Sequence, residues 1–150
     1  MQVMHSFTSI YLKMIIIVIF QLLFLSNNIY SHHLIAKVTG FEDASSPIYI
    51  FGYDRKFYFE EENAPLFIVA ERDINKFNKI NLNAFPHTKV GLFAFQDLDK
   101  DGKFSIDFKG MPLEPFGFSL NPHFNYEDIY FENFAFDMEK FSEIEIRLRK

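Results

Sequence analysis

Three carboxylates at alternate positions near the middle of the chain are the strongest chemical signal in the sequence. Asp97, Asp99 and Asp101 are followed directly by Gly102. Oxygen ligands at this spacing, followed by a glycine that permits a sharp turn, open many calcium-binding loops. Without a cation, negative charges this close together repel one another. The spacing therefore predicts a calcium site formed by the three aspartates.

The residues after this turn extend the prediction and also limit it. The carbonyl of Lys103, the side chain of Ser105 and the carboxylate of Asp107 are available as further ligands. A helix-loop-helix calcium loop ends in a bidentate Glu at its twelfth position, where this chain has Phe108. We therefore expect a calcium-bound turn in a β-protein, with Asp107 as the fourth carboxylate. The alternative is a polar turn that uses Asp and Gly for backbone conformation alone.

The other reactive residue types form no recognisable catalytic set. The chain has no cysteine, which excludes disulfides and thiol chemistry. The histidines lack zinc-ligand spacing, and the sequence around Ser119 does not match a nucleophile elbow. We therefore predict a non-enzymatic protein with no catalytic residue. The alternative enzyme would be a metal-dependent hydrolase that uses the acidic turn, with Glu114 as the base.

Strand patterns dominate the elements that must position the acidic turn. Residues 90–95 form a continuous apolar run, as expected of a central strand buried on both faces, and residues 142–149 alternate strictly between apolar and charged. Residues 129–138 fit one or two short strands. The remaining predicted strands are 34–39, 48–53, 66–70 and 77–82. About seven short strands predict an all-β fold, a two-sheet antiparallel sandwich of the immunoglobulin type.

The amino-terminal segment has the pattern of a signal peptide. Lys13 precedes an apolar block over residues 14–25, which is shorter than the roughly 20 residues of a membrane-spanning helix. Polar and small residues follow as far as Ser31. We predict a signal peptide at 1–31 and a single β-sandwich domain at 32–150. The alternative is an uncleaved membrane anchor. The protein is expected to be exported to the periplasm, the cell surface or the medium.

Charge narrows the range of partners. Residues 1–31 carry one charged side chain, so residues 32–150 have 14 basic and 20 acidic side chains and a net charge of −6. An acidic domain has no electrostatic attraction for phosphate backbones, so we exclude nucleic acid as a partner. The expected partner is a protein or carbohydrate ligand. No membrane insertion is expected after the signal peptide is removed.

The stretch from Val90 to Leu148 resembles the bacterial domain-of-unknown-function family 2141. That family shows a strand, then a run close to D-x-N-x-N-G-K-L-D, then G-I-P-x-E-x-Y-G-F-S. The acidic turn corresponds to the first run, and Gly110 to Ser119 match the second in type and spacing, with Phe116 for Tyr. This chain departs from the pattern at Gln96, where the family often has His, at Ser105, and at residues 125–127.

The resemblance implies an exported bacterial β-sandwich, similar to transthyretin-like domains, and no established activity. The leading hypothesis is a non-enzymatic binding or structural domain with a structural calcium turn. Residues 110–119 fit a structural plug, in which Glu114 accepts backbone N–H bonds, and also fit a ligand-facing loop. A third function class, a subunit of a cell-surface assembly, predicts an exposed apolar patch.

Overall fold

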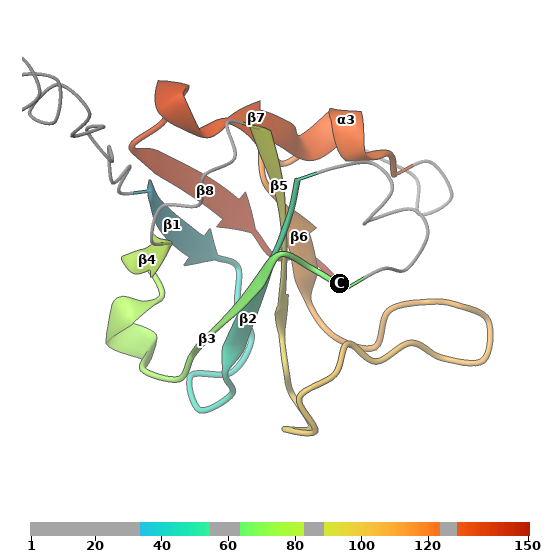
Figure 1. Cartoon of the computed structure of the whole chain (residues 1–150). Helices are drawn as coiled ribbons and strands as arrows, with labels where there is room; N and C mark the ends of the chain where they lie inside the picture. Colours follow the sequence, from blue (N-terminus) through green and yellow to red (C-terminus); the bar gives the residue numbers. More distant parts are fainter. Residues whose placement is uncertain (1–33, 55–63, 83–88, 124–128) are drawn as a thin grey trace, which may run out of the picture. The chain divides into compact units, whose positions relative to one another are not determined.

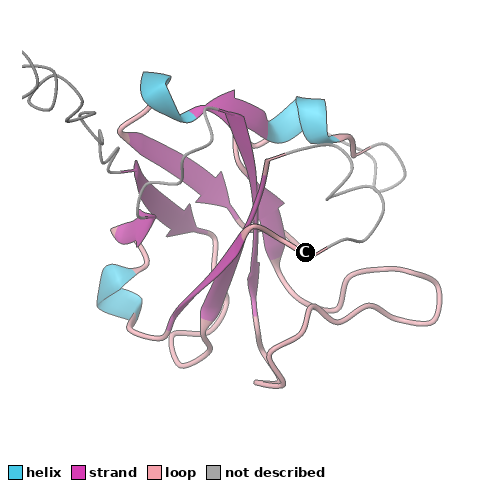
Figure 2. Ribbon diagram, viewed as in Figure 1, coloured by secondary structure: helices cyan, strands magenta, loops and turns pink. Residues whose placement is uncertain are grey.

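A computed structural model describes residues 34–54, 64–82, 89–123 and 129–150, which are dominated by β-strands (Figures 1 and 2). The described residues do not include the predicted signal peptide or the departures at 125–127. They also leave out residues 60–62 and 84–88, for which the sequence predicts an acidic loop and a turn. The described strands are β1 (Leu34–Thr39), β2 (Ile48–Tyr53), β3 (Phe67–Glu71), β4 (Ile80–Leu82), β5 (Lys89–Gln96), β6 (Phe116–Phe118), β7 (Ala135–Asp137) and β8 (Glu143–Arg147). Three short helical turns accompany them: η1 (Ile74–Lys76), α3 (Phe131–Phe134) and η2 (Met138–Lys140).

The strands form two sheets, which confirms the predicted all-β class. A three-stranded sheet has the order β4-β1-β8, and a five-stranded sheet has the order β3-β2-β5-β6 with β7 also paired to β5. The sheets are joined at one corner, where Phe116 and Arg149 exchange backbone hydrogen bonds of 2.9 and 2.8 Å. The close approach at this corner requires Gly117, because a Cβ there would lie 2.4 Å from the Arg147 carbonyl oxygen.

One strand pair departs from the predicted antiparallel arrangement. β1 and β8 are parallel, with Ala36 opposite Ile144 and Val38 opposite Ile146. The expectation of antiparallel pairing is therefore wrong for this pair, although the other strand pairs are antiparallel. The reason is that β1 and β8 come from opposite ends of the domain, so no tight turn dictates their relative direction.

β5 is buried on both faces, as its continuous apolar sequence predicts. Val90, Leu92 and Ala94 face an aliphatic core that also contains side chains of β1, β2, β4 and β8. Phe93 and Phe95 belong to a second, aromatic cluster. That cluster also includes residues of β6 and α3, namely Phe116, Phe118, Phe131 and Phe134. The alternation of side chains along β5 thus separates an aliphatic layer from an aromatic one.

One predicted strand is partly helical, and another is shorter than predicted. Within residues 129–138, Phe131–Phe134 is a single helical turn and only Ala135–Asp137 is a strand. Phe131 and Phe134, three positions apart, are both buried on one side of that turn. Tertiary packing therefore overrides their strand propensity. At 77–82 the strand is confined to Ile80–Leu82 after η1. Among the described residues, no helix is both long and apolar enough to span a membrane.

Candidate metal site

The acidic turn directly follows β5 at the start of its long connection to β6, as Figure 1 shows. Gln96, the last residue of β5, is fully buried and fixes the neighbouring β1–β2 loop. Its Oε1 accepts hydrogen bonds from the backbone N–H groups of Glu42 and Asp43, and its Nε2 donates to the Asp43 carbonyl. The position where the resembled family often has His is therefore structural in this chain.

Phe104 anchors the middle of the connection to the aromatic cluster. Its ring centroid lies 5.1 Å from that of Phe93, 5.4 Å from that of Phe95 and 5.4 Å from that of Phe116. Edge-to-face and tilted ring contacts of this kind stabilise beyond the area they bury. The acidic turn before Phe104 is therefore held between β5 and a packed side chain.

The aspartates of the turn organise its backbone. Asp97 is 1% exposed, and its two carboxylate oxygens accept from the N–H groups of Asp101 (3.2 Å) and Gly102 (2.9 Å). Asp99 also accepts from the Asp101 N–H, at 3.2 Å, and Asp101 accepts from the N–H of Lys103 at 2.7 Å. Gly102 has a φ of 79°, so the glycine after the aspartates serves the sharp turn expected of it.

Glu114 closes the turn from the other end of the connection. It is 2% exposed, and its two carboxylate oxygens accept from the N–H groups of Leu98 (2.8 Å) and Ser105 (3.0 Å). Burial raises the pKa of the Glu114 carboxyl, the two backbone N–H bonds oppose that rise, and the nearby charges of Asp97 and Asp99 add to it. The backbone contacts are those expected if Glu114 is part of a structural plug.

The structure brings three carboxylates into one group. Single oxygens of Asp97, Asp99 and Glu114 all lie within 4.8 Å of one another, and the carboxylates of Asp97 and Glu114 belong to buried residues. This separation suits a common cation with oxygen ligands. Asp101 and Asp107, which sequence reasoning also assigned as ligands, do not belong to this group. Asp107 instead accepts from the N–H groups of Lys109 and Met111, at 2.8 Å each.

The sequence suggests Glu114 as the base of a hydrolase that uses the acidic turn, or as part of a plug, but not as a ligand of the metal. The sequence signal for this position is that Glu114 belongs to the motif at 110–119. The end of this motif forms β6, which pairs with β5 and so brings the chain back beside the acidic turn. Ser119 at the end of this motif is also structural, because its Oγ accepts from the Leu92 N–H at 2.9 Å and donates to the Phe134 carbonyl at 2.6 Å. The motif therefore ties the connection, β6 and α3 to β5.

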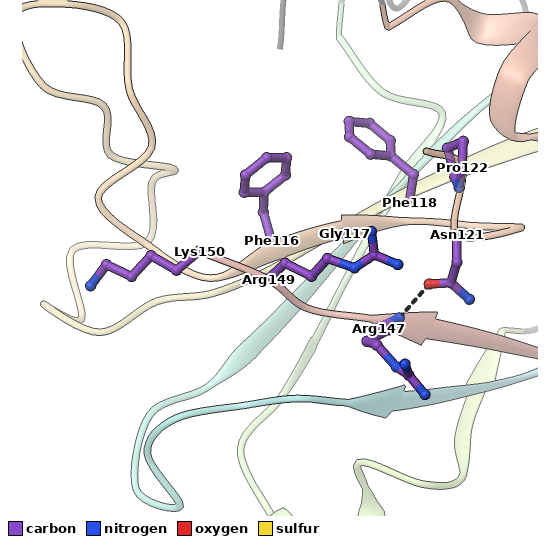
Figure 3. Close-up of a pocket in the computed structure, with 8 residues that line it drawn as sticks. All are labelled: Phe116, Gly117, Phe118, Asn121, Pro122, Arg147, Arg149 and Lys150. Atoms are coloured by element: carbon purple, nitrogen blue, oxygen red, sulfur yellow. Dashed lines mark hydrogen bonds between the residues drawn. The ribbon is translucent and has the colours of Figure 1, made fainter. Parts of the chain in front are cut away.

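A separate pocket of about 160 Å³ lies where β6 meets the end of β8. It is lined by Phe116, Gly117, Phe118, Asn121, Pro122, Arg147, Arg149 and Lys150. In Figure 3 the Arg149 side chain lies along β6, whereas Arg147 points away from the two phenylalanines. Asn121, at a φ of 46°, accepts from the Arg147 N–H at 2.7 Å and fixes this edge. None of the three grouped carboxylates lines this basic pocket.

Comparison with protein families gives one match, which covers most of the described domain. The sequence profile described as "Uncharacterized protein conserved in bacteria (DUF2141)" matches residues 36–145. The chain belongs to the DUF2141 family. This confirms the resemblance stated for Val90 to Leu148 and extends it to β1. No curated protein and no solved structure matches the chain closely enough to count as a relative.

Proposed function

We propose that this DUF2141 domain is an exported, non-enzymatic binding or structural module in which calcium fixes the connection between β5 and β6. Asp97, Asp99 and Glu114 are the proposed ligands, so that Glu114 takes the place that sequence reasoning gave to Asp101 and Asp107. The ligand or partner of the whole module would be a protein or a carbohydrate.

The observation that carries the calcium proposal is a group of like charges without a counter-charge. Two of the three carboxylates are buried. Within the described part of the chain, no lysine or arginine forms an ion pair with any of them. Burying uncompensated negative charge is costly, and a divalent cation relieves that cost. Each carboxylate oxygen that accepts one N–H bond still has a lone pair for a metal.

The contacts of Glu114 support a structural rather than a catalytic role for such a cation. A general base must have an oxygen free to reach the proton that it abstracts. Each Glu114 oxygen accepts one backbone N–H bond, and because the residue is nearly inaccessible to solvent, a substrate proton has no open path to the remaining lone pairs. We therefore favour a calcium ion that stabilises the loop over one that activates water.

Thermal unfolding of the purified protein in millimolar calcium and in chelator tests the proposal. Calcium at about 100 times its Kd should stabilise by about 2.7 kcal/mol, which raises the midpoint by several degrees. Asp99→Asn should abolish the rise. Asp107→Asn is the matched control, since Asp107 lies outside the carboxylate group, and should retain it. Coincident melts of the wild-type protein in calcium and in chelator would refute the calcium site.

The apolar segment before Ser31 supports export of the domain. Amino-terminal sequencing of the protein recovered from the producing bacterium tests this part separately. A chain that begins at or near His32 in an extracytoplasmic fraction is expected. A cytoplasmic chain that begins at Met1 would contradict it.

A further inference from the structure

The outer part of the β5–β6 connection exposes a concentration of apolar side chains. Residues 105–113, called the finger from here on, project away from the two sheets (Figure 1). Phe108 is 92% exposed, and Ile106, Met111 and Leu113 are each about half exposed. Isolated exposed apolar residues are common, but four within nine residues of chain mark an interaction site.

The finger is an ordered hairpin rather than an irregular loop. Ile106 and Pro112 form an antiparallel bridge, the Asp107 N–H donates to the Met111 carbonyl at 2.8 Å, and the Leu113 N–H donates to the Ser105 carbonyl at 2.9 Å. The Gly110 N–H donates to the Asp107 carbonyl at 3.0 Å. The apolar side chains are therefore displayed from a fixed backbone.

These bonds leave few unsatisfied donors in the finger. The N–H groups of six of its nine residues donate within the domain, and Pro112 has no N–H group. The six residues are Ser105, Asp107, Lys109, Gly110, Met111 and Leu113. An unpaired backbone N–H costs several kcal/mol in hydrocarbon, whereas a paired one does not. Among the described residues, the N–H groups of Ile106 and Phe108 have no such bond, so the finger suits the interfacial layer, where lipid headgroups and water can accept from them, rather than the hydrocarbon core.

The charges around the finger also suit a lipid surface. Lys103 precedes it, and the Lys109 ammonium lies 5.4 Å from the centre of the Phe108 ring. Lysines beside an immersed aromatic side chain can extend their ammonium groups to the phosphates of lipid headgroups. The Asp107 Oδ1 is already bonded to two backbone N–H groups of the finger.

We propose that the finger inserts into the interfacial layer of a phospholipid bilayer, with Phe108 the deepest residue. A second copy of the chain is the other occupant that an exposed apolar tip could take, and the experiment below distinguishes it from a bilayer. The domain is acidic overall, so the lipid surface is one without net charge. This inference does not depend on calcium, and it replaces the expectation from sequence that the domain avoids membranes.

A local fluorescent probe tests the proposal, because the chain has no cysteine of its own. Met111→Cys places a polarity-sensitive label on the finger. Asn78→Cys places the same label after η1, which lies on the other side of the domain from the finger (Figure 1). Both proteins are mixed with phosphatidylcholine vesicles in chelator. Quenching by spin-labelled lipids then reports the depth of each label, whatever the amino-terminal segment does.

The finger label should shift its emission to the blue and be quenched by the spin-labelled lipids, whereas the label at Asn78 should not. Phe108→Ser in the labelled chain should lower the partition coefficient by roughly tenfold or more. Ile106→Ser should lower it less. Ile68→Ser is its matched control, because Ile68 and Ile106 are 54% and 57% exposed, and should leave partitioning unchanged.

Three results would overturn the proposal. The first is no blue shift of the finger label with vesicles. The second is a shift that Phe108→Ser leaves unchanged, in a protein whose melting midpoint shows that it is folded. The third is a shift that appears without vesicles and grows with protein concentration, which would assign the finger to a contact between copies of the chain.

Discussion

The base and the finger of the β5–β6 connection differ in an unexpected way. The base, residues 97–104 together with Glu114, buries the carboxylates of Asp97 and Glu114. The finger, a few residues along the same chain, exposes Phe108 almost completely. Water-soluble domains normally bury the apolar residues and expose the charged ones. This contrast underlies the two proposals made above, a cation bound at the base and a lipid surface bound by the finger.

Backbone hydrogen bonds explain how both arrangements remain stable. At the base, carboxylates accept N–H groups that a sharp turn would otherwise leave unpaired. In the finger, backbone carbonyls and the Asp107 side chain perform the same task. The base therefore depends on its charged side chains for folding, whereas the exposed apolar side chains of the finger contribute little to it.

Removing the Glu114 carboxylate should have the largest effect on stability. Glu114→Leu keeps a similar volume but leaves the partly buried N–H groups of Leu98 and Ser105 unpaired, at about 1–3 kcal/mol for each. We expect a loss of roughly 3 kcal/mol in the free energy of unfolding, measured by urea denaturation. Glu139→Leu, at an exposed glutamate, is the control and should change stability by less than about 0.5 kcal/mol. Equal effects of the two variants would contradict a structural role of Glu114.

Acidification should weaken the calcium effect at the base. Burial raises the pKa of Glu114 above its ordinary 4.5, so the protonated form of this carboxyl stabilises the folded protein. This contribution is complete below pH 4.5 and is lost as pH rises through the raised pKa. The proposed calcium ion would bind the ionised carboxylate, so its stabilising effect should grow over the same interval. We expect a smaller calcium-induced shift of the melting midpoint at pH 5 than at pH 7.

The Glu114→Gln variant serves as the control for this pH dependence. It cannot titrate at position 114, so the part of the pH profile that belongs to this carboxyl should disappear in chelator. An identical profile in the variant and the wild-type protein would assign the pH dependence to other groups.

Substitution of Phe108 in the finger should have the smallest effect on stability. Phe108→Ser removes a side chain that is 92% exposed, so the free energy of unfolding should change by less than about 0.5 kcal/mol. Thermal or urea unfolding without lipid measures the change. A loss above about 1 kcal/mol would show that Phe108 packs in the folded protein, and the contrast between base and finger would then fail.

The sequence predicts the elements whose signals are local. The alternation before the carboxy terminus becomes β8, the apolar run at 90–95 lies within β5, and residues 34–39 form β1 as predicted. The turn at Asp97 follows the central strand as expected. These features depend on side-chain periodicity and on turn chemistry, which neighbouring residues determine.

Features that depend on distant contacts could not be predicted in the same way. The parallel pairing of β1 with β8 joins opposite ends of the domain, and no spacing encodes its direction. Glu114 reaches the aspartates because the connection folds back on itself at the finger. Phe108 belongs to a residue type that is usually buried, and only the three-dimensional course of the hairpin shows that it faces solvent.

Isothermal titration of the purified protein with calcium measures binding at the base itself. One calcium ion per chain is expected at pH 7, with loss of binding in Asp99→Asn and retained binding in Asp107→Asn. At pH 5, titrations in buffers with different ionisation heats should show proton release on binding, because calcium displaces the proton that Glu114 partly holds. The absence of binding heat at pH 7, with no shift of the melting midpoint, would contradict a calcium site at the base.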